Sequence, residues 1–256
     1  MVSISIKKLK KSQELFLVEG EKLISEIPEK YKIQQFYFTK KYAKENDISE
    51  YQERAQYVII GDNNFDKLAD TVSPQGILAI CEKINYSLDT VLKRDSLILM
   101  GENISDPGNM GTLIRTAAAA GASGAIFTEG SCSAFSPKVI RAAAGASLRF
   151  PVFEGVSAGA IFAMLHNLKI PIYAAHPHEG FLPYKVKLHD RFCLLLGNES
   201  HGISETAIQA AKKIIRLPMT VKTESLNVAV AGSILMYEAV RQRVKESERL
   251  RLSYEK

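Results

Sequence analysis

Three short stretches of the 256-residue chain are rich in small polar and charged side chains, and two of them also contain glycine. Each directly follows a run of apolar residues of the kind that forms a buried strand. In open parallel sheets, ligands bind in the crevice beyond the carboxyl ends of the strands. We therefore expect the three stretches to form one binding site. They are Glu102–Gly111 (ENISDPGNMG), Gly197–Gly202 (GNESHG) and Pro218–Asn227 (PMTVKTESLN).

The first stretch has the residues of a helix start that could bind an anion. Gly108 and Gly111 permit a tight turn, and we expect Asn109 to cap the helix that follows. Arg115 would lie about one turn inside that helix, so its guanidinium could reach back to the loop. An arginine beside a helix N-terminus suits a phosphate. A capped helix that carries a surface arginine explains the same residues equally well.

The other two stretches offer a carboxylate and two short hydrogen-bonding groups. Glu199 follows the most apolar strand of the chain, where an unpaired carboxylate would be costly, and this favours a functional role. The alternative makes Glu199 a solvated turn residue and Ser204 a helix N-cap. Ser225 and Asn227 stand just before a helix with small residues, and one of them could be its N-cap.

The sequence lacks the motifs of several other kinds of binding site. The chain has no Walker A sequence and no glycine-rich dinucleotide fingerprint, which disfavours nucleotide cofactors. Its three cysteines are widely separated and no CxxC or histidine-rich cluster occurs, so we expect no metal and a reducing, cytoplasmic location. His176 and His178 form a pair that favours a turn over a metal site.

Composition narrows the class further. With 46% hydrophobic and 24% charged residues, the chain is typical of globular proteins and unlike disordered or collagen-like ones. Its longest apolar runs are too short to span a bilayer, so we expect no membrane partner. The N-terminal lysines Lys7, Lys8, Lys10 and Lys11 precede no apolar segment, which argues against a signal peptide and predicts a basic arm.

Charge and glycine are unevenly placed. The net charge of +5 arises entirely after residue 95, where 13 of the 16 glycines also lie. A mildly basic, glycine-rich part suggests a phosphate or a nucleic acid as partner.

Alternating strand and helix patterns predict two α/β parts. Residues 1–88 should form a small α/β domain, residues 89–95 a polar linker, and residues 96–256 a larger domain with a mostly parallel sheet covered on both faces. The strands expected in the larger domain are Ser96–Met100, Ala125–Thr128, Phe150–Phe153, Ile172–Ala175, Phe192–Gly197 and Ile214–Pro218. The helices expected there are Met110–Ala120, Pro137–Ser147, Ala158–Leu168, Glu205–Lys213 and Val228–Lys245.

The three stretches together resemble the motifs of the SpoU-type RNA ribose 2′-O-methyltransferases, within the SPOUT superfamily. Asn103 to Ala120 (NISDPGNMGTLIRTAAAA) is similar to the first motif, Leu194 to Ser204 (LLLGNESHGIS) to the second, and Arg216 to Tyr237 (RLPMTVKTESLNVAVAGSILMY) to the third. Phe16–Glu21 (FLVEGE) and Ser73–Ile80 (SPQGILAI) resemble a substrate-binding domain often found ahead of them.

The resemblance implies a fold, a cofactor and an assembly. The fold would be a C-terminal trefoil-knotted α/β methyltransferase domain with a parallel sheet, behind a small α/β substrate-binding domain. The cofactor would be S-adenosylmethionine, and the protein would be a homodimer whose site takes groups from both subunits. RNA would be the substrate, ribosomal RNA being favoured over transfer RNA.

The resemblance also implies roles for individual residues of the motifs. The resemblance implies catalytic roles for Asn109, Arg115, Glu199, Ser225 and Asn227. It implies cofactor contacts from Ala175, Leu196, Gly197, Asn198, Leu217, Met219 and Leu226. For RNA binding we expect contributions from Lys7, Lys8, Lys10, Lys11, Arg115 and Arg141.

These residue types fit the implied chemistry. A ribose hydroxyl is a poor nucleophile until its proton is removed, and Arg115 would grip the adjacent phosphate and assist that step. Ser225 and Asn227 would orient the loop and the methyl donor, and Glu199 would fix the loop geometry. The competing hypothesis is an RNA-binding or assembly protein that keeps the fold without turnover.

Overall fold

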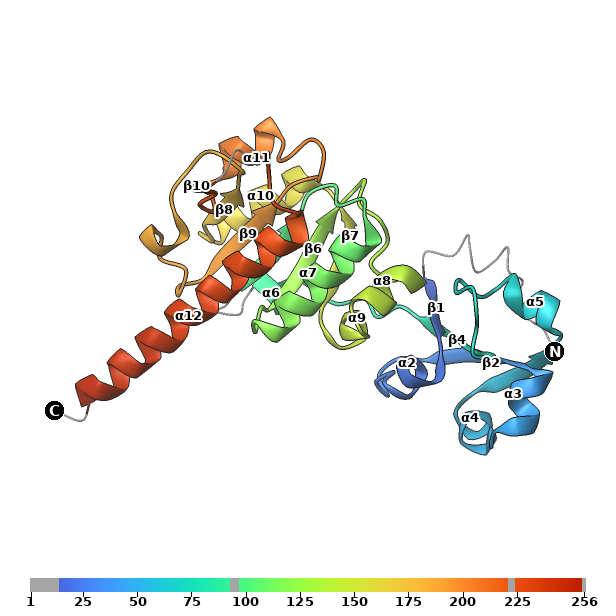
Figure 1. Cartoon of the computed structure of the whole chain (residues 1–256). Helices are drawn as coiled ribbons and strands as arrows, with labels where there is room; N and C mark the ends of the chain where they lie inside the picture. The colour runs from blue at the N-terminus through green and yellow to red at the C-terminus, as the bar shows by residue number, and fades with distance from the viewer. Residues whose placement is uncertain (1–13, 93–96, 221–223, 255–256) are drawn as a thin grey trace. The chain divides into compact units, whose positions relative to one another are not determined.

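The computed structural model of the chain describes residues 14–92, 97–220 and 224–254. The chain divides into two compact units (Figure 1). One contains the residues up to Asn85 together with Phe135–Arg149. The other contains Tyr86–Ala134 and the chain from Phe150 onward. The predicted basic arm of Lys7, Lys8, Lys10 and Lys11 lies outside the described residues.

The first unit is built on a mixed four-stranded sheet. Its strands run in the order β1-β4-β2-β3, in which β2 and β3 are parallel and the other pairs antiparallel. Aromatic residues at Phe36, Phe38 and Phe65 are fully buried and fill its core. The elements are β1 (Leu15–Glu19), α2 (Glu21–Ser25), β2 (Ile33–Thr39), α3 (Lys40–Glu45), α4 (Ser49–Arg54), β3 (Gln56–Ile60), α5 (Asp62–Asp66) and β4 (Ile77–Glu82).

Phe135–Arg149 packs with this unit although it lies far along the chain. It forms α8 (Pro137–Ala142) and α9 (Ala146–Arg149). The single helix expected over Pro137–Ser147 is wrong, because Ala144 and Gly145 adopt left-handed φ angles of 48° and 71° that end the first helix. Ser136 caps α8 as expected, with its hydroxyl accepting from the Val139 N–H.

Arg141 of α8 is held by two carboxylates of the same unit. Its Nη2 lies 2.6 Å from Asp70 Oδ2, and its Nη1 lies 3.6 Å from Glu19 Oε2. The Glu19 side chain is only 3% exposed and also accepts a hydrogen bond from the Asp70 N–H. These ion pairs give the guanidinium an intramolecular role, because a buried carboxylate needs a cationic partner. The expected contact of Arg141 with RNA stays a prediction.

The second unit contains a six-stranded sheet in which all strands are parallel. The order is β10-β8-β9-β5-β6-β7, as the predicted fold class requires. Its strands are β5 (Leu97–Gly101), β6 (Gly124–Thr128), β7 (Val152–Val156), β8 (Ile172–Ala175), β9 (Phe192–Leu196) and β10 (Lys213–Ile215). Its helices are α6 (Leu88–Leu92), α7 (Pro107–Ala119), α10 (Ala158–Asn167), η1 (Pro183–Lys185), α11 (Glu205–Ala210) and α12 (Val228–Tyr254).

Part of the expected linker at 89–95 belongs to this second core. Residues Leu88–Leu92 form α6, and Val91 and Leu92 are fully buried, while residues 93–96 lie outside the described part. Val91 occupies the space beside Gly124, where an added Cβ would come within 2.6 Å of it. The polar residues around Val91 concealed this packing role.

None of the helices in the described ranges combines the length and apolarity needed to cross a membrane. The longest, α12, carries charged residues throughout its C-terminal half.

The Arg141 ion pairs make a stability prediction. Replacing Arg141 by Met leaves the buried Glu19 carboxylate without its cation, and we expect the first unit to lose about 2 kcal/mol of unfolding free energy. Hydrogen exchange of the amides in β1 and β4 measures this unit alone.

Arg149 offers the matched control. It pairs with Glu26 at 2.9 Å, but its side chain is 50% exposed, so Arg149→Met should cost less than about 1 kcal/mol. Equal losses in the two variants would contradict the role assigned to Arg141.

Candidate functional site

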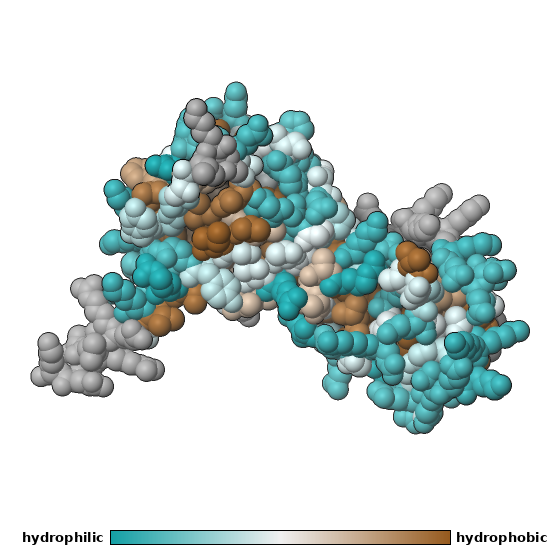
Figure 2. All heavy atoms as spheres, in the orientation of Figure 1, coloured by the Kyte–Doolittle hydropathy of each residue, from teal (hydrophilic) through white to brown (hydrophobic). Residues whose placement is uncertain are grey.

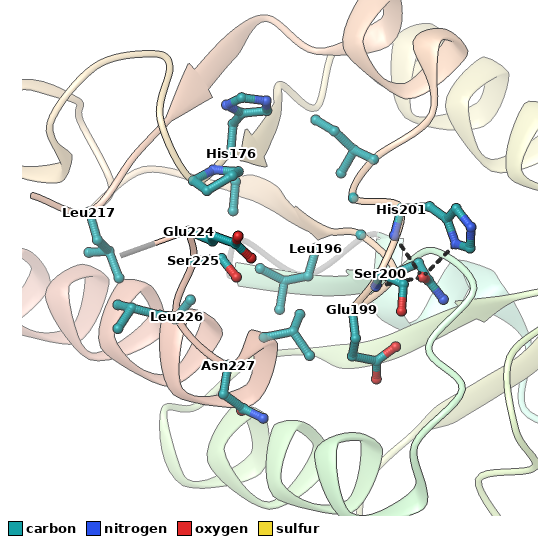
Figure 3. A pocket seen from close by; sticks show the side chains of 18 of the residues that line it. His176, Leu196, Glu199, Ser200, His201, Leu217, Glu224, Ser225, Leu226 and Asn227 are labelled. Atoms are coloured by element: carbon teal, nitrogen blue, oxygen red, sulfur yellow. Dashed lines mark hydrogen bonds between the residues drawn. The ribbon is translucent and has the colours of Figure 1, made fainter. Parts of the chain in front are cut away.

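The carboxyl ends of β8, β9 and β10 open into a cavity of about 590 Å³. Because all strands of this sheet are parallel, the loops that follow these strands meet at one edge, as expected. In Figure 3, Leu196 lies at the centre of the cavity, Leu217 and Leu226 stand on one side, and the turn from Glu199 to His201 stands on the other. A volume of this size suits a small organic ligand.

All seven residues predicted to contact the cofactor line this cavity. They come from the carboxyl ends of three strands and the loops that follow them, and the sequence alone could relate them only through the family motifs. They are Ala175, Leu196, Gly197, Asn198, Leu217, Met219 and Leu226. Their contact with a cofactor stays a prediction.

Asn198 organises the turn after β9. Its backbone exchanges two hydrogen bonds of 2.9 Å with Gly202, and its side-chain oxygen accepts from the N–H groups of Ser200 and His201 at 2.8 and 3.0 Å. Its side-chain amide donates to the Asn103 carbonyl at 2.8 Å, which ties this turn to the loop after β5. Asn198 therefore provides hydrogen-bond partners for the backbone of its own turn and also links this turn to the loop after β5.

Gly197 is required by a close backbone approach within the same turn. A Cβ on this residue would lie 2.3 Å from the carbonyl carbon of Gly202, a distance that no side chain tolerates. The strand can turn this sharply beside the cavity only because Gly197 lacks a side chain.

The Glu199 carboxylate is held by donors from the loop after β5. One oxygen accepts from the Asn109 side-chain amide at 3.1 Å and the Asp106 N–H at 3.4 Å. The other accepts from the Ser105 hydroxyl at 3.2 Å and its N–H at 3.5 Å. Burial raises the pKa of Glu199, but the hydrogen bonds from Asn109, Asp106 and Ser105 outweigh it, and the pKa lies below its ordinary value. Glu199 is not the solvated turn residue of the alternative.

Asn109 was expected to be the N-cap of α7, but this expectation is wrong. The cap is Asp106, whose side chain accepts from the Asn109 N–H at 2.7 Å, and Pro107 is the first helical residue. The helix therefore starts three residues earlier than expected. Asp106 before Pro107 is itself a recognisable start signal, so the sequence could have revealed it.

Three side chains form a continuous hydrogen-bonded chain across the site. Asn227 caps α12, with its side-chain oxygen accepting from the N–H groups of Ala229 and Val230 at 2.9 and 3.1 Å. Its amide donates to the Asn109 oxygen at 2.8 Å, and the Asn109 amide donates to Glu199. A carboxylate only accepts hydrogen bonds, so the direction of the whole chain is set at Glu199.

The structure does not bring the remaining two catalytic candidates into this chain of bonds. Ser225 is exposed and lines the cavity. Arg115 is exposed on α7 and is not among the lining residues. Because α7 starts at Pro107, Arg115 lies more than two turns into the helix rather than one, and within the described residues it has no hydrogen-bond or ion-pair partner.

Sequence reasoning missed two groups at the site. The Glu102 carboxylate accepts from the N–H and the hydroxyl of Ser204, at 2.9 and 2.7 Å, and so forms a further link between the loops after β5 and β9. Ser204 also caps α11, so this part of the alternative interpretation is correct. His176 lines the cavity, and its Nδ1 accepts from the N–H groups of His178 and Glu179, which confirms the predicted turn. The ranges that the structure describes hold no cluster of three or more potential metal ligands.

Comparison with known proteins agrees with this architecture. Residues 96–237 match the SpoU rRNA Methylase family, and residues 1–79 match the MRM3-like substrate binding domain. The 23S rRNA (guanosine(2553)-2′-O)-methyltransferase RlmP of Bacillus subtilis is 30% identical over 90% of both chains. The human mitochondrial rRNA methyltransferase 3 is 26% identical over 94% of this chain and 71% of its own length.

Solved structures share the fold of the whole chain. The SpoU methyltransferase AviRb from Streptomyces viridochromogenes, in complex with the cofactor AdoMet, superposes with a TM-score of 0.83 at 24% identity over 94% of both chains. An RNA 2′-O ribose methyltransferase superposes with a TM-score of 0.74 at 27% identity, over 94% of this chain and 93% of the other.

The chain belongs to the SpoU rRNA methylase family. Its fold class is the one that the sequence motifs implied, a parallel α/β methyltransferase domain behind a smaller α/β domain. The knot implied by the resemblance stays a prediction.

The hydrogen bonds at Glu199 predict a pH-dependent contribution to stability. Because its folded-state pKa lies below the unfolded-state value of about 4.3, ionised Glu199 stabilises the fold above that pH, and the contribution is lost as pH falls through the folded pKa. We expect Glu199→Gln to be less stable than the wild type by about 1 kcal/mol at pH 7, and the difference to disappear as pH falls through the folded-state pKa of Glu199.

Thermal unfolding across this pH range measures the difference. The control is Glu129→Gln, which removes an exposed carboxylate of the same unit and should leave the wild-type curve unchanged. A difference between wild type and Glu199→Gln that stays constant with pH would contradict the charge-based explanation.

Proposed function

We propose that this chain transfers a methyl group from S-adenosylmethionine to a ribose 2′-hydroxyl in RNA. The observation that carries the proposal is the hydrogen-bonded chain from Glu199 through Asn109 to Asn227, beside a cavity of about 590 Å³. Ribosomal RNA is the favoured substrate, because the B. subtilis relative at 30% identity is named as a 23S rRNA 2′-O-methyltransferase. Transfer RNA is the alternative.

The cavity fits the proposed cofactor. Leu196, Leu217 and Leu226 offer apolar surface for an adenine ring, and the Ser225 hydroxyl stands at the same cavity for a polar part of the cofactor. S-adenosylmethionine, when bound, supplies a methyl group activated by its positively charged sulfur.

The residues of this chain have to align and activate the ribose oxygen. Positioning of the two reactants is worth many orders of magnitude in rate, and the bonds between the loops make the site rigid enough to provide it. Arg115 grips the phosphate beside the target ribose and assists the loss of the hydroxyl proton. Its guanidinium is available for this contact, because no carboxylate of the described residues holds it.

We also propose that the protein is a homodimer. Val230, Ile234 and Tyr237 follow one another at helical spacing on α12, and each is about half exposed. Figure 2 shows hydrophobic atoms gathered over this part of α12. Arg115 does not line the cavity of its own chain, which supports a site completed by a second subunit.

Two further assignments belong to the proposal. The N-terminal domain, residues 1–88, selects the RNA, and its match to a substrate-binding domain supports this division. The protein works in the cytoplasm, which is supported by three cysteines that are all free thiols.

Arg115 provides the test of the proposed reaction. If it acts in the transition state, Arg115→Ala should lower the single-turnover rate of methyl transfer about 100- to 1000-fold and leave the affinity for S-adenosylmethionine unchanged. Arg115→Lys should rescue poorly, because an ammonium lacks the planar fork that grips a phosphate. The measurements are rapid-quench transfer to RNA under saturating conditions, and calorimetry of cofactor binding.

The outcomes separate the enzyme from a binding protein. Wild-type rates in Arg115→Ala would refute the catalytic role of this arginine. A wild-type protein that binds RNA but neither binds the cofactor nor transfers its methyl group would support the RNA-binding or assembly alternative.

The apolar row on α12 provides the test of the assembly. Ile234→Glu places a charge at the centre of the exposed row, and we expect it to convert a dimer into monomers at micromolar concentration. Leu168→Glu is the control, because Leu168 at the end of α10 is 43% exposed and lies outside that row. Sedimentation or light scattering gives the mass; a wild-type mass equal to one chain would refute the dimer.

A further inference from the structure

Residues 180–188 form a short strap, and its first part extends the parallel sheet beyond the edge strand β10. It belongs to the segment between β8 and β9, coloured gold in Figure 1. The Phe181 N–H donates to the Ile214 carbonyl at 2.9 Å, and the Arg216 N–H donates to the Phe181 carbonyl at 3.0 Å. Gly180 has a φ of 107° and approaches so closely that a Cβ would lie 2.3 Å from the Ile214 oxygen. The backbone of Phe181 is therefore fixed against the sheet.

The rest of the strap is pinned by α12. The Gln242 amide donates to the carbonyls of Pro183 and Val186 at 3.3 and 3.2 Å, and its oxygen accepts from the Leu188 N–H at 2.8 Å. Pro183 and Val186 are buried. A single polar side chain thus holds both sides of η1 in place.

This rigid strap exposes two aromatic rings. Phe181 is 53% exposed and Tyr184 is 62% exposed, although Pro183, Val186 and Leu188 of the same segment are buried. The Lys213 ammonium lies 5.2 Å from the centre of the Phe181 ring, within the range of a cation–π contact. We call Phe181, Tyr184 and Lys213 the edge platform. Because hydrogen bonds fix the backbone that carries these rings, they can stack on a flat ligand with little loss of conformational entropy.

The surroundings of the platform favour an anionic ligand. Lys185 and Lys187 are exposed on the strap. Lys212, which directly precedes β10, is exposed as well. The exposed acidic residues of the same segments are Glu179 and Asp190. Flat rings among an excess of lysines are the features that bind unpaired nucleotides, whose bases stack and whose phosphates pair with cations.

The platform is connected directly to the proposed methyl-transfer cavity. Phe181 is bridged to Ile215, and the Ile215 carbonyl accepts from the His176 N–H at 2.9 Å. Both Ile215 and His176 line the cavity. An RNA strand with one nucleotide at the cavity mouth could therefore place a neighbouring nucleotide on the strap.

We propose that the edge platform stacks an unpaired RNA base next to the nucleotide that is methylated. The proposal rests on the proposed function, because it takes RNA as the substrate of the adjoining cavity. It assigns the choice of a single-stranded or looped target to Phe181 and Tyr184, and the phosphate contact to Lys213.

The experiment compares two RNA probes on the full-length protein. One is a single-stranded oligonucleotide carrying 5-bromouridine, and the other is the same sequence in a complete duplex. We expect Phe181→Ala to weaken binding of the single strand about tenfold and of the duplex hardly at all, and Phe181→Trp to retain wild-type binding. Lys213→Gln should reduce the salt dependence of binding by about one phosphate contact.

The control and the direct readout complete the design. Leu168→Ala removes an exposed apolar side chain elsewhere in the second unit and should bind both probes as the wild type does. Photocrosslinking of the bromouridine probe should label the peptide that contains Phe181 and Tyr184, and calorimetry should give every variant the same affinity for S-adenosylmethionine.

The outcomes distinguish this inference from the function on which it rests. Unchanged single-strand affinity in Phe181→Ala, with the wild type active, would overturn the platform and leave the methyltransferase intact. A change in molecular mass instead of RNA affinity would make the strap a contact between protein copies and would also overturn it. A wild type that does not bind the cofactor would refute the proposed function, whereas crosslinking at the strap would still test the platform.

Discussion

The Glu199 carboxylate joins loops that the sheet alone would leave separate. Parallel strands bring their carboxyl ends to one edge, but they do not fix the loops that follow, and each of those loops is rich in glycine or polar residues. Glu199 takes donors from the loop after β5, and Asn109 passes the connection on to Asn227 at the start of α12. Because the pKa of Glu199 is lowered by these bonds, the acceptor stays ionised at neutral pH and the direction of every bond is settled.

This bonding divides the site into a fixed part and an available part. The fixed part consists of side chains whose hydrogen-bonding capacity is used within the protein, such as Asn198 in its turn and Glu102 on Ser204. The available part consists of Ser225 at the cavity and Arg115 on α7, which are exposed. Side chains that fix the shape of the site use their hydrogen bonds within the protein, whereas side chains that contact a substrate need to remain free to bind it.

The sequence could predict much of this arrangement, and its errors share one cause. Near-continuous apolar strands predicted a parallel sheet, which the sheet order confirms. Three polar loops predicted one binding site, and residues from all three line a common cavity. The helix start was placed at Asn109 instead of Asp106, because both residues are good caps and only the path of the backbone decides between them. The ion pairs of Arg141 could not be predicted, because the sequence shows the charge of an arginine but not the carboxylates that surround it.

The same limit applies to exposed apolar residues. Ile234, Leu235 and Met236 stand side by side in the sequence of α12, yet Leu235 and Met236 are buried within the chain while Ile234 is about half exposed. Phe181 and Phe192 are equally apolar, but β9 lies inside the sheet and the strap lies outside its edge strand, so one ring fills the core and the other faces water. Residue type fixes how much free energy burial can supply, and topology decides which residues are buried in the chain itself. Apolar side chains that remain exposed in the folded chain are therefore the ones from which binding partners have to be inferred.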